Sequence, residues 1–140
     1  MTLIAIHTTP AGAMIMTDTM VSPHVQAYPI GSMTKVKMFN HLQAAIICQG
    51  GAVVDRHWID CIGANTDLVD FDDLAAYAEA ELPDLYRQLQ SDVDAHNATT
   101  GNTAGARLAP AVVFHVGYSQ SRERYVGLSF SSDEGFVATE

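Results

Sequence analysis

Basic side chains are scarce in this chain. Its 140 residues include 7 Lys and Arg against 16 Asp and Glu, which gives a formal charge of −9 at neutral pH. A surface of this sign repels the phosphates of nucleic acids and of anionic lipid headgroups. We therefore expect neither a nucleic acid nor a membrane among the partners of this protein.

Long apolar runs are also missing. No stretch approaches the ~20 apolar residues that cross a bilayer, and the first residues lack the basic, then apolar, then small-residue order of a secretion signal. The two cysteines, Cys48 and Cys61, both lie in apolar surroundings, which favours buried, reduced thiols. These absences indicate a soluble protein of a reducing compartment, which we expect to be the cytoplasm.

The sequence carries no signature of a bound metal or cofactor. The six histidines show no pair at the spacing that zinc sites use. The acidic cluster at residues 67–73 lacks the central glycine and the final glutamate of a calcium loop, and no glycine-rich phosphate loop is present. We therefore expect no metal and no cofactor.

One short motif points to a chemistry that its context does not support. Ser32 and Lys35 form the Ser-x-x-Lys pattern that carries the nucleophile of serine β-lactamases at a helix start. Here the residues that follow alternate as in a strand, and both companion motifs of those enzymes are missing. The match is therefore attributed to chance.

The composition that remains is that of one globular domain. Apolar residues make up 48% of the chain and charged residues 16%, and 140 residues suffice for one packed core but not comfortably for two. We expect a single domain over residues 1–140.

Alternating and short apolar runs predict six β-strands. They lie at residues 2–8, 13–17, 34–40, 43–48, 111–118 and 124–130. The prolines between residues 18 and 31 predict an irregular connection there. The first two strands and the last two are separated by short turn sequences, so we expect both pairs to form hairpins.

Two helices are predicted in the middle of the chain. The first follows Gly50-Gly51, carries an apolar stripe and ends at Gly63. The second begins after Asp70 as its N-cap, and Pro83 should kink it or split it in two. Residues 95–105 are polar and small, which predicts a loop. Strands on both sides of a helical pair indicate an α+β fold with a helical layer between sheets.

The start of the chain has a chemical feature of its own. Thr2 directly follows the initiator methionine, and removal of Met1 would leave a hydroxyl and a free α-amine on neighbouring atoms. The α-amine has an unperturbed pKa of roughly 7.7–8.0, so near neutral pH it can accept the proton of its own side-chain hydroxyl. This pair is a candidate nucleophile and base.

Further residues follow Thr2 in a recognisable order. They are the first strand Thr2-Leu3-Ile4-Ala5-Ile6, then Asp18, Ser22, Lys35-Val36-Lys37, Gly50-Gly51 and the late turn Ser132-Asp133-Glu134-Gly135. This order resembles the proteasome β-subunit group of N-terminal-nucleophile hydrolases, including its bacterial relatives. The family pattern continues beyond residue 135 with strands and helices not matched here. The resemblance therefore implies an N-terminal-nucleophile-like sandwich, shortened at its C-terminal end.

The resemblance also implies a role for each matched residue. Thr2 would be nucleophile and base, and the Lys35 ammonium would lower the pKa of the α-amine while Asp18 holds the lysine charged and oriented. The Gly50-Gly51 backbone would stabilise the oxyanion, and Ser22 would contact the substrate backbone. The implied activity is hydrolysis of a peptide or another amide.

A second reading comes from another class of protein. The chain would then be a catalytically silent structural subunit of a homo- or hetero-oligomeric assembly, because a shortened sandwich leaves apolar faces to cover. Retention of Met1 would favour this reading, since it removes the free amine at Thr2.

Overall fold

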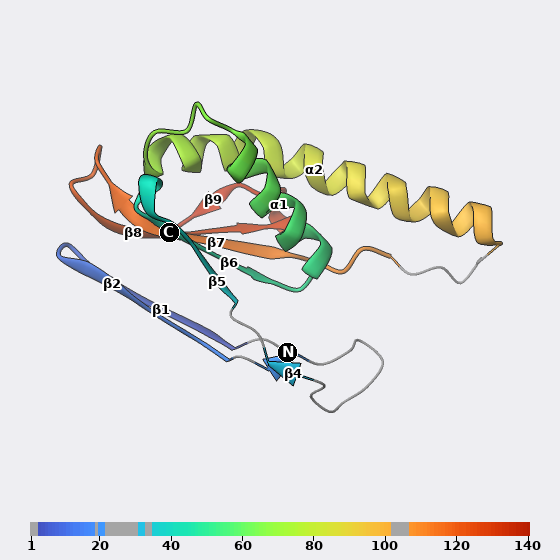
Figure 1. Cartoon of the computed structure of the whole chain (residues 1–140), viewed down its shortest axis with the longest axis horizontal. Coiled ribbons are helices and arrows are strands. Elements are labelled where there is room, and N and C mark those ends of the chain that lie inside the picture. The colour runs from blue at the N-terminus through green and yellow to red at the C-terminus, as the bar shows by residue number, and fades with distance from the viewer. Residues whose placement is uncertain (1–2, 19, 22–30, 33–34, 102–106) are drawn as a thin grey trace.

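A computed structural model describes residues 3–18, 20–21, 31–32, 35–101 and 107–140, which form an α+β fold (Figure 1). The strands are β1 (Ile4–Thr9), β2 (Gly12–Thr17), β3 (Met20–Val21), β4 (Gly31–Ser32), β5 (Val36–Phe39), β6 (Ala44–Gln49), β7 (Val112–Ser119), β8 (Arg124–Ser131) and β9 (Ala138–Thr139). The helices are α1 (Ala52–Ala64) and α2 (Phe71–Thr100), and short 3₁₀ turns lie at Asn40–Leu42 and Ser132–Glu134.

All described strand pairs are antiparallel. Strands β5 to β9 form one sheet in sequence order, and β1 and β2 form a separate hairpin. The six predicted strands are confirmed, each with its ends within two residues of the expected positions. In the predicted irregular connection, the described residues add the two-residue strands β3 and β4, which pair with each other.

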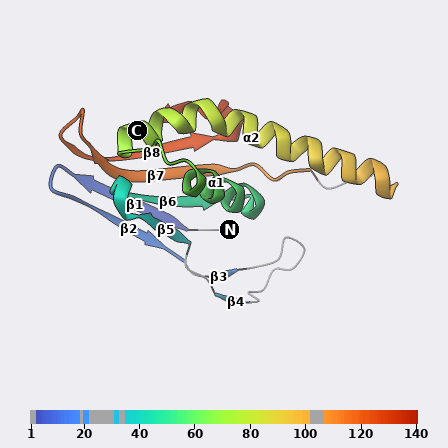
Figure 2. The same ribbon diagram turned by 45° about the horizontal axis from the view of Figure 1, so that its top comes forward.

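The hairpin and the helices cover opposite faces of the five-stranded sheet, as Figures 1 and 2 show from two directions. A side chain added at Gly117 would lie 2.3 Å from the Phe71 ring of α2, whereas one added at Gly127 would lie 3.4 Å from Ile6 of β1. Gly117 pairs with Val126 across the sheet, so these two glycines point to opposite faces. The predicted helical layer between two sheets is therefore wrong, because the helices form an outer layer.

The main core lies between the five-stranded sheet and the helices. Alternate residues of β7 and β8 face the helices, whose apolar stripes cover them. The largest fully buried side chains of the described chain are Trp58, Phe71, Phe130, Leu42, Ile46, Ile47, Ile62, Leu74, Leu82, His115, Val54 and Val113. Cys48 and Cys61 are free thiols, as expected, but both are only partly buried.

The N-terminus of α2 is capped as predicted. The Asp70 carboxylate accepts a hydrogen bond from the backbone N–H of Asp73, at 2.9 Å. The first helix begins after Gly51, as expected, and includes Gly63 before it ends at Ala64. Neither helix is long and apolar enough to cross a membrane, within the described ranges.

The length of α2 differs from the prediction. It is one helix of 30 residues that passes through Pro83 without a break and includes residues 95–100, which were expected to be a loop. Buried Leu82 and Leu89 anchor it on both sides of the proline. Near its end, the Thr99 hydroxyl donates to the carbonyl of Ala95 at 2.9 Å. The helix stops where Gly101 adopts a left-handed conformation, at φ 68°.

Candidate functional site

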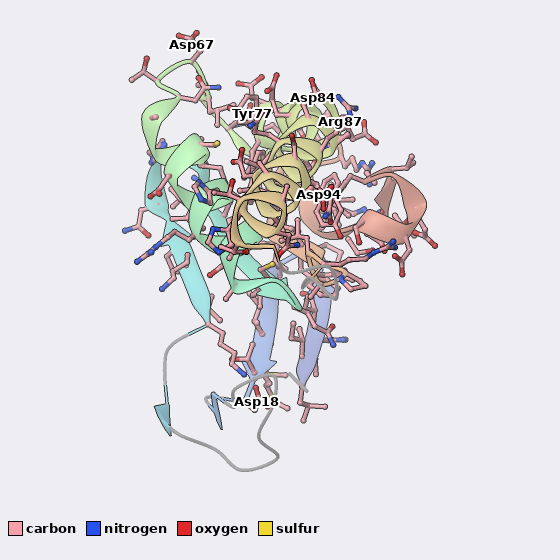
Figure 3. The ribbon with its side chains drawn as sticks, turned by 90° about the vertical axis from the view of Figure 1, so that its right-hand side faces the viewer. Asp18, Asp67, Tyr77, Asp84, Arg87 and Asp94 are labelled. Carbon is pink, nitrogen blue, oxygen red and sulfur yellow. The ribbon has the colours of Figure 1, made fainter. Side chains whose placement is uncertain are left out.

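Two of the predicted catalytic residues are in direct contact. Asp18 directly follows β2 and Lys35 directly precedes β5, and the Lys35 ammonium forms an ion pair with Oδ1 of Asp18. Both side chains are shielded from solvent, with exposed fractions of 11% for Lys35 and 18% for Asp18. Figure 3 shows Asp18 at one end of the hairpin layer, on the side of the molecule away from α2.

The ion pair is tied to the beginning of the first strand. The backbone N–H of Asp18 donates to the carbonyl of Leu3 at 3.1 Å, which continues the β1–β2 pairing by one residue. The hydrogen bond from Lys35 lowers the pKa of the Asp18 carboxyl, and a hydrogen bond from the Leu3 backbone to the carboxyl acts in the same direction. Asp18 is therefore a carboxylate near neutral pH, and it is paired with the Lys35 ammonium.

The predicted oxyanion residues form the turn between β6 and α1. Gly50 has φ of 98°, and a side chain there would collide with the Pro110 carbonyl oxygen at 2.0 Å, so this position requires glycine. Gly51 is the N-cap of α1, where the first N–H groups of a helix have no intrahelical partner. The Gly50-Gly51 turn can therefore offer N–H groups to an anion.

The glycine turn and the ion pair lie at the same end of the five-stranded sheet. Strands β5 and β6 are antiparallel and Val36 pairs with Ile47, so the start of β5 meets the end of β6. A side chain added at Gly50 would meet Pro110 and Ala111 first, and one added at Gly51 would meet Val54 and Ala109. Thr2 and Ser22, the predicted nucleophile and substrate contact, lie outside the described residues.

A second polar group, which was not predicted, lies near the start of α1 and consists of Cys48, Asp55 and Lys37. Burial raises the pKa of the Cys48 thiol to about 12, and the nearby Asp55 carboxylate adds to the rise. Burial also raises the pKa of Asp55, whereas Lys37 opposes that shift. A thiol with such a high pKa is almost fully protonated near neutral pH, which makes Cys48 a poor nucleophile.

A third group joins α2 to the β7–β8 turn. Ser119 is buried, and its hydroxyl donates to the Asp72 carboxylate at 2.6 Å. The second oxygen of Asp72 accepts from the backbone N–H of Ser121 at 2.8 Å. In the sequence, Asp72 shows only as a first-turn acid of α2, and Ser119 is 47 residues away. The group fastens the helix to the sheet.

The described surface also has a groove of about 510 Å³ beside α2. Tyr86, Arg87, Gln90 and Asp94 of α2 line one side, and Ser132 and Phe136 line the other. Figure 3 places Arg87 and Asp94 on the helical layer, far from Asp18. The groove is therefore separate from the Lys35–Asp18 pair.

Neither a metal-binding cluster in the described part of the chain nor a known relative adds to this site. Within the described residues, no group of three or more His, Cys, Asp or Glu side chains could hold a metal ion. Searches of protein-family models, curated proteins and solved structures also found no match to this chain. The candidate site is therefore defined by the geometry around Asp18 and Lys35.

Proposed function

We propose that this protein is an amide hydrolase whose nucleophile is the hydroxyl of Thr2, set free with its α-amine when Met1 is removed. The observation that supports this function is the shielded ion pair between Lys35 and Asp18. The backbone N–H of Asp18 bonds to the carbonyl of Leu3, the residue that directly follows Thr2. In this proposal, the pair holds a positive charge beside the α-amine of Thr2, where the base needs one.

The lysine has a definite task in this reaction. An α-amine must be neutral to accept a proton, and an ammonium nearby lowers its pKa and so favours the neutral form. The same positive charge stabilises the alkoxide that develops on the threonine hydroxyl. Asp18 keeps the Lys35 side chain fixed in one orientation.

The reaction then proceeds in two balanced steps. The α-amine of Thr2 takes the hydroxyl proton while the oxygen attacks the substrate carbonyl carbon, and the departing amine leaves with that proton as the carbon–nitrogen bond breaks. Water next hydrolyses the resulting ester, which releases the acid and restores the threonine. The N–H groups of the Gly50-Gly51 turn are our candidates for stabilising the oxyanion in both steps.

The first experiment concerns the chain start. Intact-mass analysis of the protein from producing cells should show the loss of Met1. The processed protein should hydrolyse members of a panel of short fluorogenic peptide amides. Full retention of Met1, or an equally active protein with an extra residue before Thr2, would rule out the mechanism.

The second experiment concerns the nucleophile. Thr2→Ala should lower kcat/KM by three or more orders of magnitude, as loss of a catalytic nucleophile does. The matched control is Thr139→Ala, an exposed threonine of β9, which should keep full activity. A peptide β-lactone should acylate the wild type at Thr2 and add its own mass, whereas Thr2→Ala should stay unmodified.

A further inference from the structure

The outer surface of the β1–β2 hairpin is unusually apolar for a solvent-facing layer. Met14, Met16 and Leu3 have exposed fractions of 58%, 59% and 67%, and Met38 of the neighbouring edge strand β5 has 64%. Residues 3–17 contain no acidic residue, lysine or arginine. Exposed apolar side chains that gather on one side of a protein mark interaction surfaces.

The two hairpin methionines share one face. Met14 pairs with His7 and Met16 with Ala5, and all four are exposed. Residues between them, such as Ile6 and Ile15, are partly buried against the sheet. The alternation therefore points Met14 and Met16 away from the five-stranded sheet.

Met38 belongs to the same side of the molecule. Met38 pairs with Ala45, Ala45 with Val116, and Val116 with Gly127, so all four residues point to the same face of the sheet. Gly127 faces Ile6, so this is the face that the hairpin covers. Strand β2 contacts β7 as well as β8, whereas β1 lies against β8, so β2 is nearer to the β5 edge. We call Leu3, Met14, Met16 and Met38 the methionine face.

The net negative charge of the chain lies on the side of the molecule opposite the methionine face. Residues 52–100, which include both helices, carry eleven acidic and two basic side chains, a balance equal to the −9 of the whole chain. The rest of the chain carries five of each sign. Figures 1 and 2 show the helices and the hairpin on opposite sides of the sheet. One side is therefore strongly acidic, and the other is neutral and apolar.

From this separation we infer that the methionine face binds a second copy of this chain in a two-fold symmetric dimer. Two acidic proteins repel each other, and the repulsion is smallest when the acidic helical layers point outward and the neutral faces meet. A two-fold interface uses the same patch on both copies, and an apolar patch is complementary to itself. Methionine suits such a contact because its flexible side chain adapts to an apolar neighbour.

The backbone of the hairpin favours the same arrangement. Strands β1 and β2 pair only with each other among the described strands, so each has an edge with unpaired main-chain groups. Charged side chains on an edge strand commonly protect it against pairing with another chain. Neither strand of the hairpin carries one. Pairing of hairpin edges between copies could therefore accompany burial of the methionines.

The test is the mass of the protein in solution. Sedimentation or light scattering at ~50 μM should give about twice the 15.1 kDa of one chain. The double variant Met14→Glu and Met16→Glu should be a monomer with an unchanged circular dichroism spectrum. Its control, Val69→Glu with Val137→Glu, adds the same charge at exposed apolar positions outside the methionine face and should stay dimeric.

Charge reversal separates a second copy from any other occupant. A variant with Met14→Lys and Met16→Lys should also be a monomer, and an equimolar mixture with the glutamate variant should form a mixed dimer. A monomeric wild type, a dimer that survives both double variants, or a mixture that stays monomeric would overturn the inference. None of these readouts depends on hydrolytic activity, so the dimer and the proposed function can fail separately.

Discussion

The indole N–H of Trp58 donates a hydrogen bond to Nε2 of His115 at 3.0 Å, and both side chains are fully buried between α1 and the sheet. Because Nε2 accepts this bond, the imidazole hydrogen is on Nδ1, which has no hydrogen-bond partner among the described residues. A protonated imidazole would be a buried charge without a counter-ion. Burial accordingly lowers the pKa of His115 to about 3.

This pair predicts that acid destabilises the fold over a defined pH range. In the unfolded chain His115 would titrate near pH 6.5, so below that pH the unfolded state binds a proton that the folded state does not bind until about pH 3. The free energy of unfolding should fall by up to about 1.4 kcal/mol per pH unit between these limits. Above pH 6.5 the histidine has no effect on the pH dependence.

Urea unfolding between pH 7 and 4.5 measures the effect, with the fluorescence of Trp58, the one tryptophan, as the signal. His115→Gln should be less stable at pH 7 but should flatten the pH dependence, because a glutamine oxygen can accept the indole hydrogen bond without titrating. The exposed His57 supplies the control His57→Gln, which should keep the wild-type slope. An unchanged slope in His115→Gln would contradict the assignment.

The link between α2 and the β7–β8 turn gives a second prediction. Asp72→Ala removes the acceptor of two hydrogen bonds, one from the buried Ser119 hydroxyl and one from the Ser121 N–H. We expect a loss of about 1–3 kcal/mol in the free energy of unfolding. Asp84→Ala removes an exposed ion pair with Arg87 instead and should change stability by less than about 1 kcal/mol.

A double-variant cycle checks that Asp72 acts through the serine. With Ser119→Ala already in place, Asp72→Ala should cost clearly less than it does alone, because one of its hydrogen bonds is already lost. Equal costs in both backgrounds would show that the two side chains are independent.

The third prediction concerns the pH dependence of the proposed hydrolysis. Lys35→Met removes the ammonium, so the pKa of the Thr2 α-amine should rise and the ascending limb of the kcat/KM profile should move to higher pH. Lys35→Arg keeps the charge and should retain part of the activity at neutral pH. Lys37→Met, a change two residues further along the chain, is the control and should leave the limb in place.

If Lys35→Met lowers kcat/KM at every pH without moving the ascending limb, Lys35 has a structural role instead. Asp18→Asn serves as a second probe, because it removes the carboxylate that holds Lys35 without removing the ammonium. Its activity should lie between those of the wild type and Lys35→Met.

Most helices and strands were predictable because residues close in the sequence determine where they form. Alternation along β8 places every second side chain on the buried face, and Asp70 in front of an apolar helical stripe is a typical N-cap. The order of the layers was not predictable in this way. Periodicity tells which face of an element is buried, but not whether a helix or a hairpin covers it, as Gly117 and Gly127 illustrate.

The position of the C-terminal end of α2 was not predicted, for another reason. Residues 91–100 contain few apolar side chains, and α2 is held there by bonds such as the Thr99 hydroxyl to the Ala95 carbonyl and by the left-handed Gly101. At the site, Asp18 and Lys35 could be proposed from their order, but their contact depends on how the end of β2 meets the start of β5. Such long-range contacts need the tertiary structure.

The last prediction concerns Pro83, which lies inside α2 without breaking it. Proline lacks the N–H that would bond to the Glu79 carbonyl, and in a helix interior it costs about 3 kcal/mol relative to alanine. Proline also restricts the unfolded chain, a benefit of about 0.4–1 kcal/mol that is lost on substitution. Pro83→Ala should therefore raise the free energy of unfolding by about 2 kcal/mol, measured by urea denaturation.

The neighbouring variant Asp84→Ala is the control for this change, because it adds an alanine to the same exposed turn without restoring a backbone hydrogen bond. It should leave stability nearly unchanged. Pro83 also lines the groove with Tyr86 and Phe136, whose ring centroids are 5.5 Å apart. A loss of stability in Pro83→Ala would contradict this prediction. It would show that the contacts of the proline ring in this groove stabilise the protein by more than the missing hydrogen bond destabilises the helix.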